Sequence, residues 1–262
     1  MAKCAYRRRL VLWQNQRGNV GDTQAMAKAQ LDIDRIRCTP AYSFAEAAHY
    51  LKLPYSTLLS WFKGQTYKHN DELRRFQPVI RMDGKPGEGP SFLNLVEAHV
   101  LVAITREHRI PLQKVRRALE YVERQLGLER PLISARFETD GVDLLVRELE
   151  KLVNVSQDGQ LEIEPVVRTF LKRIKRDPAG VPIKLYPFTR KAVSDHEPEP
   201  VEIDPRIAFG RPVLAGRGVP TAVLADRFKA GDSLADLAQD YATSPQVIEE
   251  AIRCELSRRE AA

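Results

Sequence analysis

Hydroxyl and cationic side chains gather between residues 55 and 63, in "YSTLLSWFK", and they have the chemistry of a nucleic-acid contact. Hydroxyl groups donate hydrogen bonds to phosphates or base edges, and the N-terminus of a helix itself attracts phosphate. Nearby cations add attraction to the phosphate backbone. The predicted contacts to double-stranded DNA are Ser43, Tyr55, Ser56, Thr57, Ser60, Lys63, Lys68, Arg81 and Lys85.

Two short predicted helices position these side chains. Ser43 is a good N-cap for the first helix, and Glu46, three residues later, completes a capping box. The second helix is expected to begin near Pro54 or Ser56 and to end at Gly64. Two short helices joined by a tight turn are typical of a helix-turn-helix.

The segment "RFQPVIRMDGKPGEGPSFLNL" comes after the second helix and is expected to form a hairpin around "DGKPGEG". Directly after such a helix, the hairpin would act as a wing, with Arg81 and Lys85 on or near its tip. Residues 42–130 hold 14 Lys and Arg against 10 Asp and Glu, a net charge of +4. Helix-turn-helix patterns also occur in protein-binding modules, but the wing and the positive charge favour DNA binding.

The glycine-rich stretch "FGRPVLAGRGVPT", residues 209–221, has the composition of a phosphate-binding loop but not its pattern. A P-loop requires a lysine directly after its last glycine, whereas Val219 and Pro220 come after Gly218 here. The dinucleotide-binding pattern G-x-G-x-x-G is also missing. The glycines are therefore interpreted as turn residues that adopt positive φ.

Motifs for catalysis or metal binding are missing from the sequence. The five histidines and three cysteines are scattered without ligand spacing, and neither G-x-S-x-G nor HExxH occurs. The carboxylates of Asp140, Asp143, Glu148 and Glu150 are expected on solvated surfaces. We therefore expect a protein that is not an enzyme and has no metal and no cofactor. A nuclease or nucleotide-binding enzyme is the weaker alternative.

The pattern along the chain predicts a mainly α fold with a small β component (α+β) and several regions. Residues 1–38 are expected to be a disordered arm, 42–130 a winged helix-turn-helix with long helices, 131–196 a small β-containing region and linker, and 197–262 a C-terminal helix-turn-helix module of three helices. The runs "LISARFETDG", "DLLVREL" and "KLVNVSQDGQLEIE" are interpreted as strands. No apolar run is long enough to span a bilayer, and the isolated cysteines are typical of a reducing cytoplasm.

The helix predicted from Pro111 to about Leu126 has a narrow apolar seam with spacings of three and four residues. The seam is formed by Leu112, Val115, Leu119, Val122 and Leu126. Such a seam either packs within its own domain or joins two copies of the chain, and the spacing leaves both possibilities open.

The C-terminal block, 226–262, carries 5 Lys and Arg against 8 Asp and Glu, a net charge of −3. Its last helix is expected to direct Gln246, Glu249 and Glu250 outward. Since carboxylates repel phosphate, a protein partner or a dimer contact is favoured over DNA for this module.

Two stretches resemble known families. "YSFAEAAHYLKLPYSTLLSWFKG" resembles the MerR-like helix-turn-helix of bacterial regulators. "IDPRIAFGRPVLAGRGVPTAVLADRFKAGDSLADLAQDYATSPQVIEEAIRCEL" resembles the small domain, of formerly unknown function, of antitoxins that accompany PIN-like ribonuclease toxins. Together they resemble a VapB-type antitoxin over nearly all of residues 42–257.

The resemblance implies a non-catalytic homodimer that binds operator DNA, represses its own operon and neutralises a VapC-like PIN-domain toxin. PIN nucleases hold divalent metal with clustered carboxylates, so cationic side chains could neutralise that site. Arg253, Arg258 and Arg259 are the candidate toxin contacts, although they also fit a solvated helix end. The alternative function is a stand-alone MerR-like transcriptional regulator with a C-terminal dimerisation domain.

Overall fold

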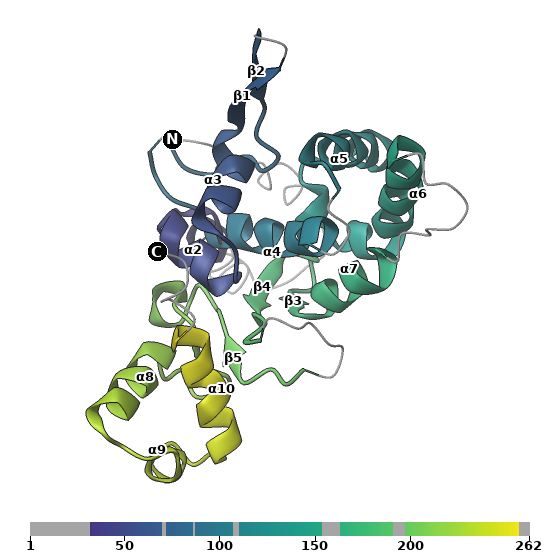
Figure 1. Cartoon of the computed structure of the whole chain (residues 1–262). Helices are drawn as coiled ribbons and strands as arrows, with labels where there is room; N and C mark the ends of the chain where they lie inside the picture. Colours follow the sequence, from purple (N-terminus) through teal and green to yellow (C-terminus); the bar gives the residue numbers. More distant parts are fainter. Residues whose placement is uncertain are drawn as a thin grey trace.

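The computed structural model describes residues 32–69, 72–85, 87–106, 110–153, 163–190 and 197–256 (Figure 1). Their buried side chains form two hydrophobic cores. The larger core draws on residues between Tyr42 and Ile203, and the smaller core on residues between Val201 and Cys254. Helices dominate and strands are short, which confirms the predicted mainly α fold with a small β component.

The elements are joined in a simple order along the chain. Besides a helix over residues 32–38, the α-helices of the described residues are α2 (Phe44–Tyr50), α3 (Tyr55–Lys63), α4 (Phe92–Arg106), α5 (Leu112–Leu126), α6 (Val142–Val153), α7 (Ile163–Lys172), α8 (Thr221–Ala230), α9 (Leu234–Asp240) and α10 (Pro245–Leu256). The strands are β1 (Gln65–His69), β2 (Glu72–Phe76), β3 (Ile174–Arg176), β4 (Pro182–Leu185), β5 (Val201–Glu202) and β6 (Val213–Leu214). In the described part of the chain the strands pair antiparallel as β1–β2, β3–β4 and β5–β6.

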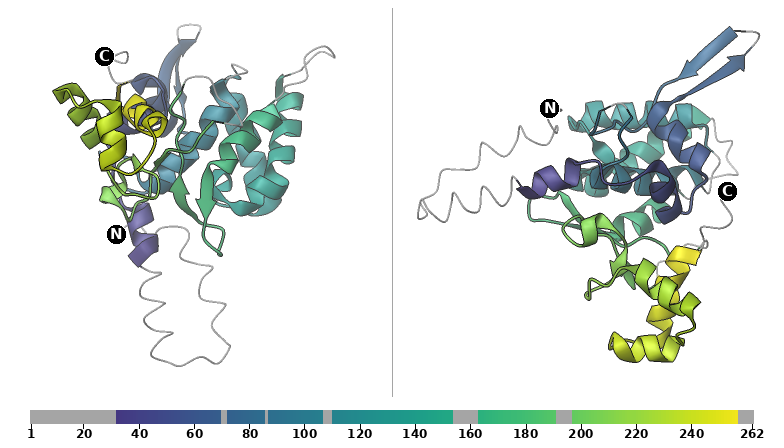
Figure 2. Two further views of the ribbon diagram at one scale, coloured as in Figure 1. Left: turned by 90° about the horizontal axis from the view of Figure 1, so that it is seen from below. Right: turned by 90° about the vertical axis from the view of Figure 1, so that its left-hand side faces the viewer.

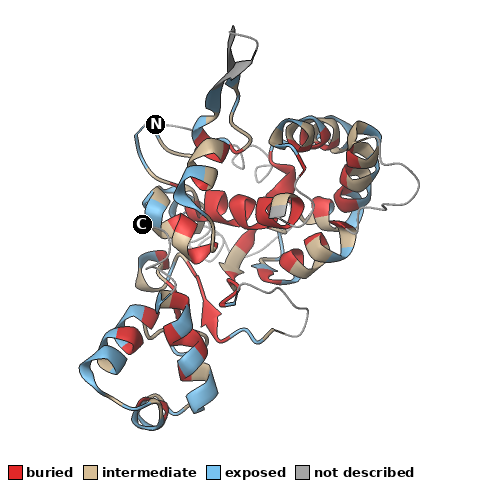
Figure 3. Cartoon of the chain, viewed as in Figure 1, coloured by how far each residue is buried: buried red, intermediate tan, exposed pale blue. Residues whose placement is uncertain are grey.

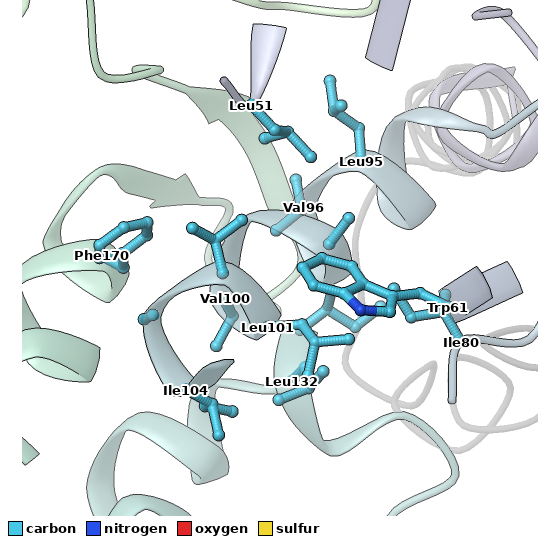
Figure 4. Packing of buried hydrophobic residues seen from close by; sticks show 14 of the residues in the cluster. Leu51, Trp61, Ile80, Leu95, Val96, Val100, Leu101, Ile104, Leu132 and Phe170 are labelled. Carbon is cyan, nitrogen blue, oxygen red and sulfur yellow. The ribbon is translucent and has the colours of Figure 1, made fainter. Parts of the chain in front are cut away.

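Helix α4 lies at the centre of the larger core. Every residue from Phe92 to Ile104 is buried, as expected for a helix that is apolar nearly all round (Figure 3). Figure 4 shows Trp61 of α3 and Phe170 of α7 packed around α4. Because α3 packs directly on this central helix, the helix-turn-helix is anchored on a rigid core.

Residues 131–153 are helical except at Ser134, so the strand prediction for "LISARFETDG" and "DLLVREL" was wrong. A 3-10 turn covers Pro131–Ile133, a π-helical turn covers Phe137–Gly141, and α6 begins directly afterwards. The buried residues of α6 recur at helical spacing, at Val142, Leu145 and Leu149. Most of the third expected strand, "KLVNVSQDGQLEIE", lies outside the described residues.

The larger core is continuous from Tyr42 to Phe188, so residues 131–190 pack together with residues 42–130. Strands β3 and β4 close this core, and Leu185 of β4 forms a bridge with Ile203. Ile203 directly follows β5, so this bridge joins the larger core to the β5–β6 pair and, through it, to the three helices of the smaller core.

The expected arm of residues 1–38 is helical over residues 32–38. Arg37 in this helix is buried, and its guanidinium lies 2.9 Å from a carboxylate oxygen of Asp177. This long-range ion pair orders the segment in a way that its polar composition did not predict. Residues 1–31 lie outside the described residues.

The apolar seam of α5 is occupied within the chain. Val115, Leu119 and Val122 are buried, and α5 packs against α6. The seam is therefore filled by its own domain and does not offer a surface for self-association. Among the described residues, no helix has the length and apolar character needed to cross a membrane.

Candidate nucleic-acid interface

Helix α3 has one buried face and one polar face. Leu58, Trp61 and Phe62 are buried in the larger core. Tyr55 is 46% exposed at the first position of the helix, next to the exposed Ser56. The N-terminus of α3, with unsatisfied backbone N–H groups, is thus open to a ligand.

Two of the serine hydroxyls predicted to contact DNA already donate a hydrogen bond within the chain. The Ser43 hydroxyl donates to Glu46 Oε2 at 2.9 Å and accepts from the Glu46 N–H at 3.1 Å, forming the predicted capping box. The Ser60 hydroxyl donates to the carbonyl oxygen of Thr57 at 2.7 Å. Phosphate oxygens are only acceptors, so either serine must give up its present bond before it can donate to a phosphate.

Lys63 is exposed at the last position of α3. Its ammonium lies 5.4 Å from the centre of the Phe44 ring, within cation–π range. The contact links the end of α3 to the start of α2 and leaves the ammonium facing water. Lys63 is therefore placed as a cation at the foot of the next hairpin.

The hairpin β1–β2 begins directly after α3 and projects from the body of the protein (Figure 1). Gly64 joins them with a φ of +71°, and a Cβ atom there would lie 2.0 Å from the carbonyl oxygen of Phe76. Only glycine satisfies both the left-handed backbone and this close approach. The strand register sets Thr66 opposite Arg75 and Lys68 opposite Leu73.

The hairpin that follows α3 therefore lies at residues 65–76, earlier in the chain than the wing predicted around residues 83–89. "DGKPGEG" does not join two strands, so Arg81 and Lys85 are not at a hairpin tip. The signal for the true hairpin was the glycine at position 64 before "QTYKH", with Asn70 and Asp71 as turn-favouring residues between the strands.

Arg81 and Lys85 lie instead in a loop that is tied to α3. The N–H groups of Val79 and Ile80 both donate to the carbonyl oxygen of Trp61, at 2.8 and 3.1 Å. The Arg81 side chain is 75% exposed, with its guanidinium 3.8 Å from Glu123. Lys85 is exposed as well. The loop therefore keeps both cations next to the helix-turn-helix without a second hairpin.

A buried ionic network fixes this loop. Arg130 donates from Nε to Glu97 at 2.9 Å and from a terminal nitrogen to Asp83 at 2.8 Å. Asn94 donates to the carbonyl oxygen of Arg81 at 2.8 Å. Burial alone would lower the pKa of the Arg130 guanidinium, but its two carboxylate partners raise it, so the charge is retained. The network gives no local signal in the sequence, because Arg130 and Asp83 are far apart in the chain.

The C-terminal module touches the helix-turn-helix directly. The Tyr42 hydroxyl donates to the carbonyl oxygen of Gly210 at 3.0 Å, and Arg211 lies 2.8 Å from Glu46. In the turn between α2 and α3, the Lys52 ammonium donates to the carbonyl oxygen of Cys254 at 3.1 Å. The two cores are therefore joined at the helix that carries the capping box.

The candidate toxin contacts fall on or beyond helix α10. Arg253 is half-exposed and lies 2.5 Å from Glu249 and 3.5 Å from Glu250. Glu249 is exposed as predicted, but Glu250 is buried, because it accepts hydrogen bonds from Thr189 and Arg190. Arg258 and Arg259 lie outside the described residues. Among the described residues, no cluster of His, Cys, Asp and Glu has the arrangement of a metal site.

Known protein families match both the helix-turn-helix region and the C-terminal module. Residues 40–119 match a family described as "Putative DNA-binding HTH domain". Residues 201–253 match a family described as "Protein of unknown function (DUF433)". The first match covers α2, α3 and the hairpin, and the second covers the module that contacts them.

Relatives from Mycobacterium tuberculosis match across both regions. "Putative antitoxin VapB45" is 28% identical over 81% of this chain and 92% of its own length. "Uncharacterized protein Rv2308" is 25% identical over 86% of this chain and 94% of its own length. The X-ray crystal structure of Rv2018 aligns with a TM-score of 0.60 and 25% identity, over 82% of this chain and 98% of that one. These matches confirm the predicted resemblance to a VapB-type antitoxin with an N-terminal helix-turn-helix.

Proposed function

We propose that the protein is a non-catalytic, DNA-binding antitoxin that represses its own operon and neutralises a VapC-like PIN-domain ribonuclease. The observation that carries the DNA-binding part is the junction at Gly64. At this glycine α3, with its exposed polar face, ends and the projecting β1–β2 hairpin begins. Similarity to a protein named as an antitoxin supports the second part.

In the proposed complex, the N-terminal turn of α3 enters the major groove of the operator. Tyr55, Ser56 and Thr57 would contact base edges or phosphates, because they form the first turn of α3, where Tyr55 and Ser56 are exposed and Thr57 is half-buried. The hairpin and the cations Lys63, Arg81 and Lys85 would contact the flanking phosphates. Two copies of the chain would bind two half-sites about 34 Å apart, one turn of DNA, as helix-turn-helix dimers do.

The C-terminal module is the proposed toxin-binding part. Its net negative charge disfavours DNA, and it carries Phe209, the most exposed large apolar side chain among the described residues. Arg253, Arg258 and Arg259 stay candidates for contact with the carboxylates of a PIN-type site. Of these, Arg253 already pairs with Glu249 and Glu250 within the chain.

The decisive experiment combines two binding measurements on the full-length protein. We expect fluorescence anisotropy to detect tight, salt-dependent binding to DNA from upstream of its gene. We also expect the product of the neighbouring gene to be toxic when expressed alone, and to co-purify with this protein and lose its toxicity when both are expressed.

The two parts of the proposal can fail separately. Operator binding without binding or rescue of the neighbouring product would exclude the antitoxin function and leave a stand-alone MerR-like regulator. Rescue without operator binding would exclude autorepression by this chain alone. Cleavage of RNA or DNA by the purified protein would contradict its assignment as non-catalytic.

A further inference from the structure

Phe209 is the most exposed large apolar side chain in the described part of the protein. It is 91% exposed, whereas the next such residue, Leu256, is 49% exposed. An aromatic ring held almost completely in water is unfavourable, and single chains commonly bury such a ring. Phe209 therefore needs an explanation beyond the fold of the isolated chain.

The backbone that presents Phe209 is strained. Ala208, Phe209 and Gly210 have φ values of +46°, +54° and +77°, so three successive residues are left-handed. This region is natural for glycine but unfavourable for alanine and for a bulky aromatic residue. Strain of this kind persists where the surrounding structure imposes it, and it is concentrated at functional sites.

The surroundings do impose this conformation. The N–H groups of Gly210 and Arg211 donate to the carbonyl oxygens of Ile207 and Ala208, at 2.9 and 3.0 Å. The buried Tyr42 hydroxyl donates to the carbonyl oxygen of Gly210, and a Cβ atom at Gly210 would lie 2.5 Å from that hydroxyl. The turn is thus fastened to the residue that precedes the helix-turn-helix, and the Phe209 ring is presented from a fixed base.

Two arginines flank the ring in sequence, and each is the more exposed member of an ion pair. The Arg206 side chain is 43% exposed, whereas its partner Asp204 is fully buried. The Arg211 side chain is 40% exposed, whereas its partner Glu46 is 24% exposed. On each side of Phe209 in the sequence, the guanidinium is therefore the more exposed member of its ion pair.

We infer that the turn Ile207–Gly210 is a protein-docking anchor, in which Phe209 enters an apolar pocket bordered by carboxylates on a partner protein. An aromatic residue presented rigidly between arginines has the composition of an interface hot spot. The inference rests on the proposed function, since the partner it assigns is the toxin. It places the main contact at this turn and not at the C-terminal arginines.

A nucleic-acid partner is less favoured by the same observations. Arg206 and Arg211 could donate further hydrogen bonds to phosphate as well as to carboxylate, but a phosphate backbone offers no apolar pocket for the exposed Phe209 ring. A carboxylate-rimmed pocket can share these guanidinium groups through additional hydrogen bonds, because each guanidinium has five N–H donors.

The test uses the full-length protein and the purified product of the neighbouring gene. Phe209→Gly removes the ring and suits the left-handed backbone, so we expect the variant to be at least as stable as the wild type. We expect it to bind the neighbouring product at least about 30-fold more weakly, as for a hot-spot side chain. Phe228→Ala, which removes a ring that is 40% exposed on α8, is the matched control and should change binding less than about threefold.

Any other result overturns the inference, and the measurements show whether the proposed function fails with it. If the wild type binds and Phe209→Gly binds equally well, the anchor is wrong but the proposed function stands. If the wild type does not bind the neighbouring product, the proposed function fails and the inference fails with it. A shift from dimer to monomer in light scattering would assign the ring to contact between copies of this chain. A specific loss of operator affinity would assign it to nucleic acid.

Discussion

Helices α2 and α3 and helices α9 and α10 begin in the same way but end in different surroundings. Ser43 with Glu46 caps α2, and Ser233 with Asp236 caps α9, each through a complete capping box. Each first helix has seven residues, and a short turn leads to the second. The shared start shows that local capping chemistry builds this motif but does not decide what it binds.

The difference lies in the exposed face of the second helix and in the segment after its end. The first turn of α3 exposes Tyr55 and Ser56, and a projecting hairpin begins where the helix ends. Helix α10 exposes Glu249, which pairs with Arg253, and buries Glu250 against Thr189 and Arg190. The first unit therefore offers hydroxyls and a cation outward, whereas the charged side chains of α10 pair within their own chain. Figure 2 shows the β1–β2 hairpin projecting beside the first unit.

Replacing Gly64 tests this comparison with the largest expected effect. Gly64 and Gly216 have the same φ of +71°, but a Cβ atom would meet the Phe76 carbonyl at Gly64 and nothing within 4 Å at Gly216. We expect Gly216→Ala to cost about 1–2 kcal/mol from the left-handed backbone alone. Gly64→Ala should cost about 1–3 kcal/mol more, because it overpacks the foot of the hairpin.

Urea unfolding measures both costs, and operator titration measures the consequence. Gly64→Ala should also weaken operator binding more than about tenfold, which is a loss of more than about 1.4 kcal/mol, whereas Gly216→Ala should leave it unchanged. Equal operator affinities for the two variants would show that the hairpin does not contact DNA.

Glu249 and Glu250 are neighbours on α10 with opposite environments. Glu250→Ala should destabilise the protein by about 1–3 kcal/mol, because buried Thr189 loses a hydrogen-bond partner and Arg190 loses its carboxylate. Glu249→Ala removes only an exposed ion pair and should cost about 0.5 kcal/mol or less. Urea unfolding at pH 7 compares them, and equal costs would contradict the packing role of Glu250.

The cost of losing Glu250 should also depend on pH. Burial would raise the pKa of this carboxyl, but hydrogen bonds from Arg190 and Thr189 outweigh it and lower the pKa below its ordinary value of 4.5. A carboxyl with a lowered pKa in the folded state stabilises the protein above pH 4.5, and this contribution is lost as the pH falls through the folded-state value. The difference between wild type and Glu250→Ala should therefore shrink between about pH 5 and pH 3.

The capping boxes were predictable from sequence, because their chemistry is local. Ser43 and Glu46 are three residues apart, and so are Ser233 and Asp236. The end of α3 at Gly64 is explained by glycine's tolerance of positive φ in the same way. The predictions that were wrong concern residues whose environment depends on partners far away in the sequence. Glu250 is buried because Arg190, 60 residues away, pairs with it.

The wing was misplaced for a related reason. "DGKPGEG" is rich in residues that favour turns, but its Asp83 accepts a hydrogen bond from Arg130, 47 residues further along the chain, and the segment forms a loop instead of a hairpin. The true hairpin has only a weak local signal, and the close approach of Phe76 that requires Gly64 appears only in three dimensions. Helix α6 is different, since its apolar spacing at Val142, Leu145 and Leu149 was available in the sequence. The strand prediction instead gave more weight to Asp140 and Gly141, a pair typical of turns between strands.

The two capping serines provide a smaller test. Ser43→Ala and Ser233→Ala should each cost about 1 kcal/mol of stability, because each removes the hydroxyl from a capping box. Since the Ser43 proton is already donated to Glu46, Ser43→Ala should change operator affinity no more than Ser233→Ala does. A selective loss of operator affinity in Ser43→Ala would instead show that this serine exchanges its capping bond for a phosphate.

The smallest expected effect is a change in salt dependence at the end of α3. Lys63 is exposed beside the hairpin, whereas Lys229 is exposed on α8 and pairs with Asp226 at 3.2 Å. If Lys63 neutralises one phosphate, Lys63→Ala should reduce the slope of log affinity against log salt by about one and weaken binding a few-fold. Arg81→Ala should do the same, while Lys229→Ala should leave the slope unchanged. Operator titrations between about 50 and 200 mM salt measure these slopes. An equal reduction for Lys229 would mean that the C-terminal module lies on DNA despite its acidic helices, and that the two units share one partner.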